Sequence, residues 1–229
     1  MIEIEVTDQW RKYFPGAHIG ILLMGNMDNT KHPTPLDEMK KNLASSLCSR
    51  YEGQSRADLL EMEVLRAYRS YYGNFGNTYH VQLQLESILH KGKSLPNVSP
   101  LVDAVFAAEM ESLLLTAGHD ADKLCFPVKI DQSLGTEKFI QINGAEKTLK
   151  ADDMMMTDAK GVVCSILYGQ DQRTPISPKT RRALFVTYVP PGIKTESLSL
   201  HLDTIKRNII LFAPDAEVEY RNVYTADGK

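Results

Sequence analysis

Hydrophobic residues recur at helical spacing in one continuous block of the chain, residues 34–116, and at strand spacing on both sides of it. Before the block, Ile2, Ile4 and Val6 alternate with acidic residues, and residues 18–24 form a short apolar run. Strict alternation is typical of a half-buried strand, and a short apolar run is compatible with a buried one. A strand region, a helical cluster and a second strand region in this order predict an α+β protein rather than a βαβ series.

Polar residues mark where the helices of the block begin. Thr34 stands before Pro35, which is favoured in the first helical turn, and Ser99 stands before Pro100 in the same way. Ser55 is followed three residues later by an acidic residue, which is the pattern of a capping box. We therefore expect four helices, over residues 34–51, 55–68, 78–90 and 99–116.

Turn residues divide the rest of the chain into strands. The Asn143-Gly144 pair, flanked by apolar positions, is a strong signal for a β-hairpin. A second hairpin is expected around the turn at residues 158–161. The expected strands are residues 139–142, 147–149, 154–157, 162–168, 183–189 and 216–223, and a further helix is expected over residues 195–211.

Length and composition are those of a globular protein with a sizeable core. Of the 229 residues, 43% are hydrophobic and 24% are charged, so we expect a single domain over residues 1–229, with two intimate subdomains as the alternative. The N-terminus lacks the pattern of a signal peptide, and no apolar stretch approaches the ~20 residues that span a bilayer. We expect a cytoplasmic protein without membrane contact, in which Cys48, Cys125 and Cys164 are reduced thiols in small apolar spaces.

The common signatures of catalysis and cofactor binding are absent from the sequence. It contains no phosphate-binding loop, dinucleotide fingerprint, nucleophile elbow or metal-ligand spacing, so we expect no cofactor and no metal. His119, Asp120 and Asp122 come closest to a constellation. They would form a base or a metal site, or else a turn after a helix in which the Asp side chains bond nearby backbone amides.

Three segments carry an ordered set of motifs. Residues 94–124 contain a proline-bearing turn, a Val-Asp helix start and an Asp-x-Asp-Lys-Leu ending, and residues 139–163 contain a hairpin with an Asn-Gly turn and then a strand ending in Asp. Residues 168–192 follow with a Thr-rich helical turn and a strand. In this order the segments resemble the B3/B4 domain of the phenylalanyl-tRNA synthetase β subunit, over residues 70–192. The resemblance implies a β-sandwich-like core with flanking helices.

In that family the domain contains a pocket that hydrolyses tyrosine wrongly attached to the phenylalanine tRNA. The resemblance places the family's editing histidine on Ala117, with His119 two residues later as a displaced substitute. The tyrosine-recognising glutamate falls near Gln172, and the Gly-Gly pair before it is replaced by Gln170 and Asp171. The resemblance thus implies His119, Asp171 and Gln172 as catalytic residues, with Ala117 in substrate binding.

Further substrate-binding candidates lie at the ends of the same segments. Ser99 would face the pocket or only cap the helix that it opens. Arg173 and Thr174 would lie at the pocket mouth, or else anchor their loop. The helix-start Asp103 is expected to be structural, because a carboxylate in the first turn is favoured by the helix dipole.

Two short basic clusters are candidate RNA contacts: Lys91 with Lys93, and Lys179 with Arg181 and Arg182. Proteins that contact many phosphates usually carry a strong positive excess, whereas this chain has a net charge of -3. The clusters therefore make a local RNA contact, or they form an ordinary solvated face.

An aromatic segment supplies four rings that would either stack on bases or pack between helices, and packing is expected for most of them. The rings are those of Tyr71, Tyr72, Phe75 and Tyr79.

Two functions of different classes follow from these expectations. The first is tRNA binding with hydrolysis of mischarged aminoacyl-tRNA. The second is a non-catalytic module that binds an amino-acid-like small molecule, or tRNA, through the inherited pocket. The motifs of the synthetase's aminoacylation core are absent, so synthesis of aminoacyl-tRNA is not expected.

Overall fold

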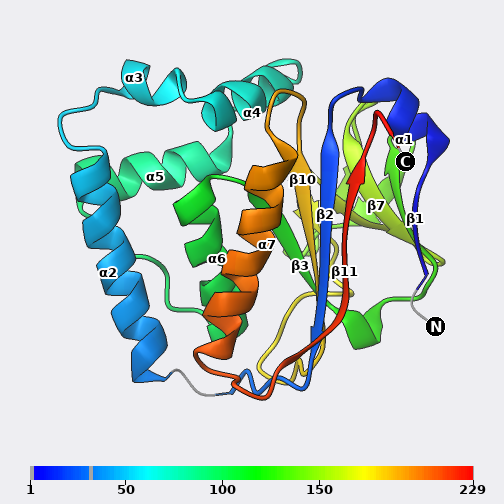
Figure 1. The fold of residues 1–229 in the computed structure, drawn as a ribbon. Coiled ribbons are helices and arrows are strands. Elements are labelled where there is room, and N and C mark those ends of the chain that lie inside the picture. The colour runs from blue at the N-terminus through cyan, green and yellow to red at the C-terminus, as the bar shows by residue number, and fades with distance from the viewer. Residues whose placement is uncertain (1–2, 31–32, 229) are drawn as a thin grey trace.

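The computed structural model describes residues 3–30 and 33–228. Its elements form three layers: a group of helices, a four-stranded sheet and a five-stranded sheet (Figure 1). The helices are α1 Asp8–Tyr13, α2 Thr34–Arg50, α3 Arg56–Leu60, α4 Glu63–Gly73, α5 His80–Lys91, α6 Pro100–Ser112 and α7 Thr195–Ile210. The strands are β1 Ile4–Val6, β2 His18–Gly25, β3 Leu115–Asp120, β4 Val128–Gln132, β5 Lys138–Ile140, β6 Glu146–Thr148, β7 Met154–Asp158, β8 Gly161–Ser165, β9 Gly169–Gln170, β10 Ala183–Val189 and β11 Glu217–Thr225.

The four-stranded sheet is the central layer. Its order is β11-β2-β10-β3, so β3 is an edge strand, and all three neighbouring pairs are antiparallel. All seven residues of β10 are buried, because helices cover one face of the sheet and the second sheet covers the other (Figure 1). Burial of both faces accounts for the mostly apolar sequence of this strand.

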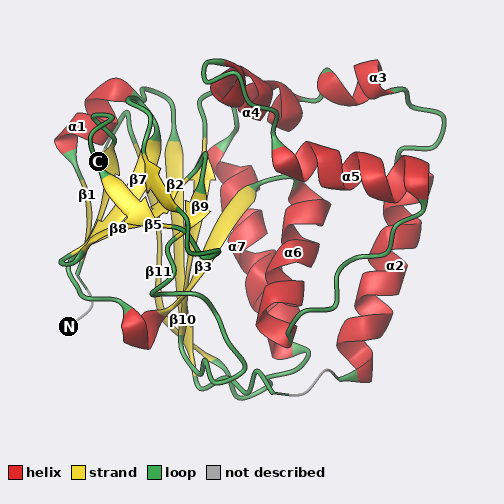
Figure 2. Ribbon diagram, turned by 180° about the vertical axis from the view of Figure 1, so that it is seen from behind, coloured by secondary structure: helices red, strands yellow, loops and turns green. Residues whose placement is uncertain are grey.

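The second sheet has the order β1-β4-β7-β8-β9, and β5 pairs with β6 as a separate hairpin. Seen from behind, this sheet and the helical layer lie on opposite sides of the central sheet (Figure 2). One hydrophobic cluster includes buried side chains from the helices and from both large sheets. The α+β class with a sandwich-like core and flanking helices is therefore confirmed.

The helical block differs from expectation at its boundaries. Thr34 is the first residue of α2 rather than its cap, since Pro33 holds the capping position. The capping box of Ser55 is present, but the helix that it starts ends at Leu60, and Met62 takes an extended conformation before α4 begins. The single helix expected over residues 55–68 is therefore two helices, α3 and α4.

The largest error is at the end of α6. A helix was expected to residue 116, whereas α6 ends at Ser112 and β3 begins at Leu115. Leu113 adopts the left-handed conformation, with φ of 63°, and breaks the helix between them. The leucine run at this point is compatible with a buried helix or a buried strand, so periodicity could not decide. Sequence reasoning also missed α1, β4 and β9, and the helical turn expected within residues 168–192 is wrong, because the described residues between β9 and β10 form no helix.

The remaining expected strands form, although β8 ends at Ser165 rather than at residue 168. Both hairpins form, one with Gly144 in its turn and one between β7 and β8. Helix α7 and strands β2, β10 and β11 lie where the patterns placed them. The expected strand around Ile4 is β1, and Ile2 lies outside the described residues.

The aromatic segment packs inside the protein, as expected. Tyr71, Tyr72 and Tyr79 are buried, and only Phe75 is partly exposed. All three cysteines are free, but Cys48 is exposed, so the expectation that it fills an apolar space is wrong. No helix within residues 3–30 and 33–228 is long and apolar enough to cross a membrane.

Candidate functional site

A cavity of about 700 Å³ lies between α6, the edge strand β3 and the segment that joins β8 to β9. Most of its walls are apolar. The lining residues are His80, Val98, Val102, Val105, Phe106, Glu109, Leu115, Thr116, Ala117, Gly118, Ile142, Cys164, Ser165, Ile166, Leu167, Tyr168, Gly169, Gln170, Pro175, Ile176 and Tyr188.

One face of α6 forms a wall of this cavity. Val102, Val105, Phe106 and Glu109 recur at spacings of three and four residues, so they share a face of the helix. Three of the four are apolar. Val98, just before the helix, is largely exposed and lies at the rim. The wall therefore runs from an apolar rim to a single carboxyl group.

That carboxyl group, Glu109, is buried. Its Oε1 accepts a hydrogen bond from the backbone N–H of Thr116 at 2.7 Å. Burial raises the pKa of Glu109 to about 8, and the bond from Thr116 opposes the shift. At pH 7 the side chain is therefore mostly uncharged.

The edge of β3 forms a second wall. The N–H groups of Thr116 and Asp120 bond outside the sheet, to Glu109 and to the carbonyl oxygen of Thr174. In an antiparallel ladder the outward-facing residues alternate, so Gly118 between them also points its N–H and C=O away from β10. The Gln170 amide donates to the Gly118 carbonyl oxygen.

Gly118 also permits the close approach of the neighbouring loop. A Cβ at this position would lie 2.9 Å from Cδ1 of Ile176 and 3.2 Å from Cδ1 of Phe185. A side chain here would displace the Ile176 side chain, which lines the cavity, and would therefore change the shape of the cavity.

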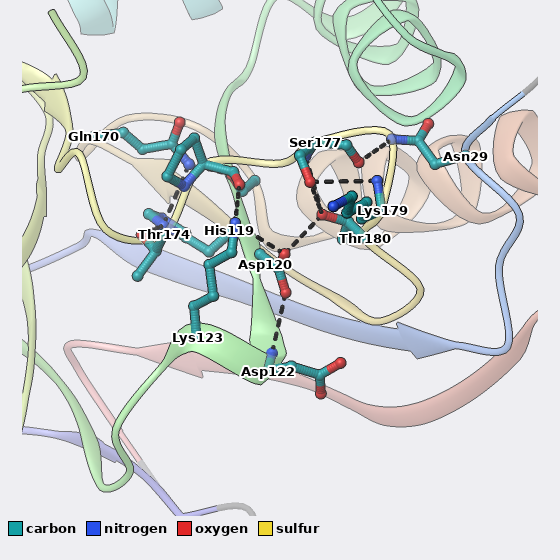
Figure 3. Close-up of polar contacts among 12 residues, drawn as sticks. Asn29, His119, Asp120, Asp122, Lys123, Gln170, Thr174, Ser177, Lys179 and Thr180 are labelled. Carbon is teal, nitrogen blue, oxygen red and sulfur yellow. Dashed lines mark hydrogen bonds and ion pairs between the residues drawn. The ribbon is translucent and has the colours of Figure 1, made fainter.

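His119 lies behind the cavity wall. Its side chain is fully buried, and Nδ1 lies 2.9 Å from Oγ1 of Thr174 (Figure 3). Thr174 Oγ1 donates its own hydrogen to Asp171 Oδ1 at 2.6 Å, so His119 Nδ1–H is the donor to Thr174. Burial lowers the pKa of His119 to about 3, which keeps the ring neutral at pH 7.

The structure joins Asp171, Arg173 and Thr174 in one loop-holding network. Asp171 Oδ1 accepts from the backbone N–H of Thr174 at 3.1 Å, and its Oδ2 lies 2.6 Å from Nε of Arg173. The Arg173 guanidinium also makes two bonds to Asp158, at 3.1 and 3.2 Å. These contacts tie the loop after β9 to the end of β7, and none of the three residues lines the cavity.

The other expected substrate-binding residues differ in whether they line the cavity. Ala117 lines the cavity, whereas Ser99 does not. The hydroxyl of Ser99 makes no cap bond; it receives a 3.4 Å bond from Asn29, whose Oδ1 accepts the N–H of Leu101 instead. Gln172 is exposed and bonds through its backbone N–H to the carbonyl oxygen of Ile140.

Asp103 is enclosed in the first turn of α6. It forms an ion pair with Lys40, and its Oδ1 accepts from the N–H of Val98 at 2.9 Å. These bonds stabilise the start of α6 and the turn before it, as expected of a structural carboxylate.

The His119–Asp122 segment is a strand end followed by a short 3₁₀ helix, rather than a turn after a helix. Asp120 Oδ1 accepts from the N–H of Asp122 at 3.3 Å, and its Oδ2 accepts from the Thr180 hydroxyl at 2.8 Å (Figure 3). Lys123 lies 3.2 Å from Asp120 Oδ2. Within the described residues, no group of three or more His, Cys, Asp or Glu side chains could hold a metal ion.

The two basic clusters differ in their partners. Arg181 lies 2.5 Å from Asp28, and Arg182 lies 2.6 Å from Glu219, so acidic groups offset both charges. For Lys91, Lys93 and Lys179, all exposed, there is no acidic partner within residues 3–30 and 33–228.

Two lysines lie beside the cavity. Lys93 shares a shallow groove with His80 and Phe106, both of which also line the cavity. The Lys147 ammonium lies 4.7 Å from the ring centroid of Tyr168, another lining residue. Positive charge therefore flanks the cavity from two separate segments.

Sequence reasoning missed the polar groups that line the cavity. Glu109 carried a signal, because it is a lone acid in the apolar stretch AVFAAEM. Tyr188 lies in an apolar strand and carried none. Its hydroxyl is buried beside the thiol of Cys164, which is a weak hydrogen-bond partner.

Comparison with known proteins places this geometry in a family. The family model described as "B3/4 domain" matches residues 66–209. A solved structure, an N-terminal fragment of the phenylalanyl-tRNA synthetase beta-subunit from Pyrococcus horikoshii, is similar with a TM-score of 0.50 and 13% sequence identity. The match covers 97% of this chain and 54% of that fragment, so the chain spans about half of the structure that it resembles. No curated protein matches the chain.

The fragment supports the fold alone, because its identity to this chain is low. The family match covers more than half of the chain and contains α6, β3 and the β8–β9 segment, which are the elements around the cavity. The chain therefore belongs to the B3/4 domain family.

Proposed function

We propose that this chain is a cytoplasmic RNA-binding protein that recognises the aminoacyl end of a tRNA, with residues 1–229 acting as a single domain. The amino-acid side chain would occupy the cavity beside β3. The observation that carries the proposal is a mostly apolar cavity of about 700 Å³ in a B3/4 domain. Ligand sites commonly have volumes of ~300–1,000 Å³ and a few converging polar groups.

The walls suit an amino-acid side chain. Val102, Phe106 and Ile176 offer hydrocarbon contacts, and burial of such surface stabilises a complex by about 25 cal/mol per Å². The outward N–H of Gly118 and the amide of Gln170 offer hydrogen bonds to the polar end of an aminoacyl group. Ala117 would contact the ligand directly.

The RNA contact in this proposal is local. Lys93 and Lys147 would face phosphates next to the aminoacyl end, because they flank the cavity. Lys91 and Lys179 would add weaker contacts, whereas the acidic partners of Arg181 and Arg182 reduce their attraction for RNA. A few contacts suit a chain with a net charge of -3.

Hydrolysis of mischarged aminoacyl-tRNA is the second candidate. The Gly118 N–H favours it, since a backbone donor on a strand edge can hold an ester carbonyl oxygen as it gains charge. His119 and Asp171 would then act as positioning residues through Thr174, because neither lines the cavity. Exposed Gln172 would contribute only if its loop closed over the ligand.

Filter binding with charged and uncharged tRNA tests the proposal. We expect charged tRNA to bind at least tenfold more tightly, and Ala117→Phe, which fills the cavity, to abolish the difference. Ala57→Phe, on the exposed surface of α3, is the matched control and should retain it. Equal affinity for charged and uncharged tRNA in the wild type would refute the proposal.

The same charged tRNAs separate the two candidates. Release of labelled amino acid faster than in buffer, lost in Ala117→Phe, would establish hydrolysis as well as binding. Tight binding without release of amino acid would support the binding function and exclude hydrolysis. Thermal-shift measurements with free amino acids test whether the ligand needs the tRNA at all, because a ligand that binds the folded state raises apparent stability.

A further inference from the structure

Glu109 is an unusual group for an apolar cavity. It is a carboxyl group with 8% exposure, and its only hydrogen bond within residues 3–30 and 33–228 is the one from Thr116 to Oε1. Its Oε2 has no hydrogen-bond partner among the described residues, and no lysine or arginine pairs with the carboxyl in that part of the chain. A buried carboxyl without a counter-charge is costly to the fold, so a role in binding is a natural reason for its presence.

A second polar atom in the same cavity has only a weak partner. The Tyr188 hydroxyl is fully enclosed beside the thiol of Cys164, which is a poor hydrogen-bonding group, and both residues line the cavity. Enclosed polar groups are nearly always hydrogen-bonded in folded proteins. Two incompletely satisfied groups in one cavity, on α6 and on β10, point to a ligand that completes them.

Aromatic rings share the cavity with this carboxyl. Phe106, Tyr168 and Tyr188 all line it, and a ring face attracts a cation. Rings together with one carboxyl are the surroundings in which proteins bind organic ammonium groups. An uncharged apolar side chain would leave Glu109 without a partner for Oε2.

We propose that Glu109 makes the inner end of the cavity a subsite for an ammonium group, so that the preferred ligand is an amino-acid derivative with a cationic amine at the end of an otherwise apolar side chain. The inference rests on the proposed function, because it concerns the same cavity. Glu109 lies seven residues beyond Val102 on α6, about 10 Å farther from the Val98 rim. A ligand whose ester end stays at the rim would thus present the far end of its side chain to Glu109.

The titratable groups around Glu109 are uncharged at neutral pH. Burial raises the pKa values of the tyrosines and of Cys164, and burial lowers the pKa of His80. No protein cation therefore competes with the ligand for the carboxyl. These groups are Tyr68 and Tyr72 of α4, Tyr79 before α5, His80 of α5, Cys164 of β8 and Tyr188 of β10.

Calorimetry with hexylamine and 1-hexanol tests the subsite, since the two probes share a hydrocarbon chain and differ in the terminal group. We expect hexylammonium to bind the wild type at least tenfold more tightly than hexanol. Glu109→Gln should remove that preference and leave hexanol binding within twofold. Glu111→Gln, on the same helix but outside the cavity, is the control. Thermal unfolding establishes that each variant is folded.

Proton release gives an independent readout. An ammonium ion would ionise Glu109, so binding at pH 7 should release close to one proton, measured in buffers of different ionisation enthalpy. Glu109→Gln should release none. Equal hexylammonium affinity in wild type and Glu109→Gln, or absence of proton release, would overturn the inference.

Two further outcomes separate this inference from the proposed function. If hexanol binds as tightly as hexylammonium and Ala117→Phe blocks both, the cavity is a ligand site and only the ammonium subsite fails. If neither probe binds, both ideas fail. Nα-acetyl-lysine amide and Nε-acetyl-lysine amide then distinguish a side-chain ammonium from an α-ammonium: the first should bind more tightly, and the reverse order would contradict the orientation.

Discussion

The hydroxyl of Tyr68 is inserted between the two strands that border the cavity, and its removal should weaken the fold markedly. Tyr68 is fully buried, and its ring stacks on that of Tyr79 with the centroids 4.1 Å apart. The hydroxyl donates to the carbonyl oxygen of Tyr188 on β10 and accepts from the N–H of Leu115 on β3 at 2.9 Å. It therefore replaces one direct bond of the ladder with a bridge.

Tyr68→Phe keeps the ring and removes the bridge. Leu115 N–H and Tyr188 C=O are then both left without their partner in a buried position. Each unsatisfied group costs about 1–3 kcal/mol, so the free energy of unfolding should fall by roughly 2–4 kcal/mol, allowing for partial relaxation. In a domain of this size that corresponds to a decrease in Tm of about 4–16 °C.

Urea unfolding measures this loss. Trp10 is the only tryptophan of the chain and is fully buried, so its fluorescence reports unfolding, with circular dichroism as a second probe. Tyr51→Phe is the matched control, because Tyr51 is also buried and its hydroxyl makes no hydrogen bond among the described residues. The control should lose less than about 0.5 kcal/mol. Equal losses in the two variants would refute the bridging role of Tyr68.

Three further perturbations test other parts of the structure. Folding raises the pKa of Glu109 to about 8, so the protonated carboxyl stabilises the fold at low pH and this stabilisation is lost as the pH rises toward 8. The Tm of Glu109→Gln should therefore increase relative to that of the wild type between pH 5 and pH 8.5. A constant Tm difference across that range would contradict the raised pKa. Lys93→Gln should weaken tRNA binding and reduce the slope of log affinity against log salt concentration by ~0.7–0.9. Lys206→Gln, at an exposed position of α7, should change neither the affinity nor the slope. Equal slopes for the wild type and Lys93→Gln would exclude a phosphate contact at Lys93. Gly20→Ala would place a Cβ 2.6 Å from Cδ1 of Leu198 and 3.2 Å from Cδ2 of Leu202, so these side chains of α7 must rearrange, and we expect a loss of about 1–3 kcal/mol in unfolding experiments; an unchanged stability would contradict tight packing of α7 on β2.

Elements with a strong local signal were predicted well. The Asn143-Gly144 turn fixes its hairpin because only a few residue types tolerate its backbone conformation, and Gly144 does have a positive φ. Helix α7 was equally clear, since its apolar residues recur at one spacing. The leucine run after α6 was not clear, because an apolar segment buried on all sides has no period that separates helix from strand.

Candidate site residues were harder to predict than elements. The resemblance to a family indicated the correct region, and it placed Ala117 and Gln170 near the cavity that the structure contains. It could not show that His119 and Asp171 bond to Thr174 behind the wall, since that depends on how β3 meets the loop after β9. The role of each of these residues stays a prediction.

Turn residues, caps and periodicity act over a few neighbouring positions, so the fold class, the family and most of the secondary structure could be predicted from the sequence. Which polar groups share the cavity depends on the packing of distant segments. Glu109 and Tyr188 are 79 positions apart in the sequence, and they line one cavity because α6 and β10 both lie next to β3. Burial then sets the pKa of Glu109, and burial is a property of the packed layers rather than of any local sequence.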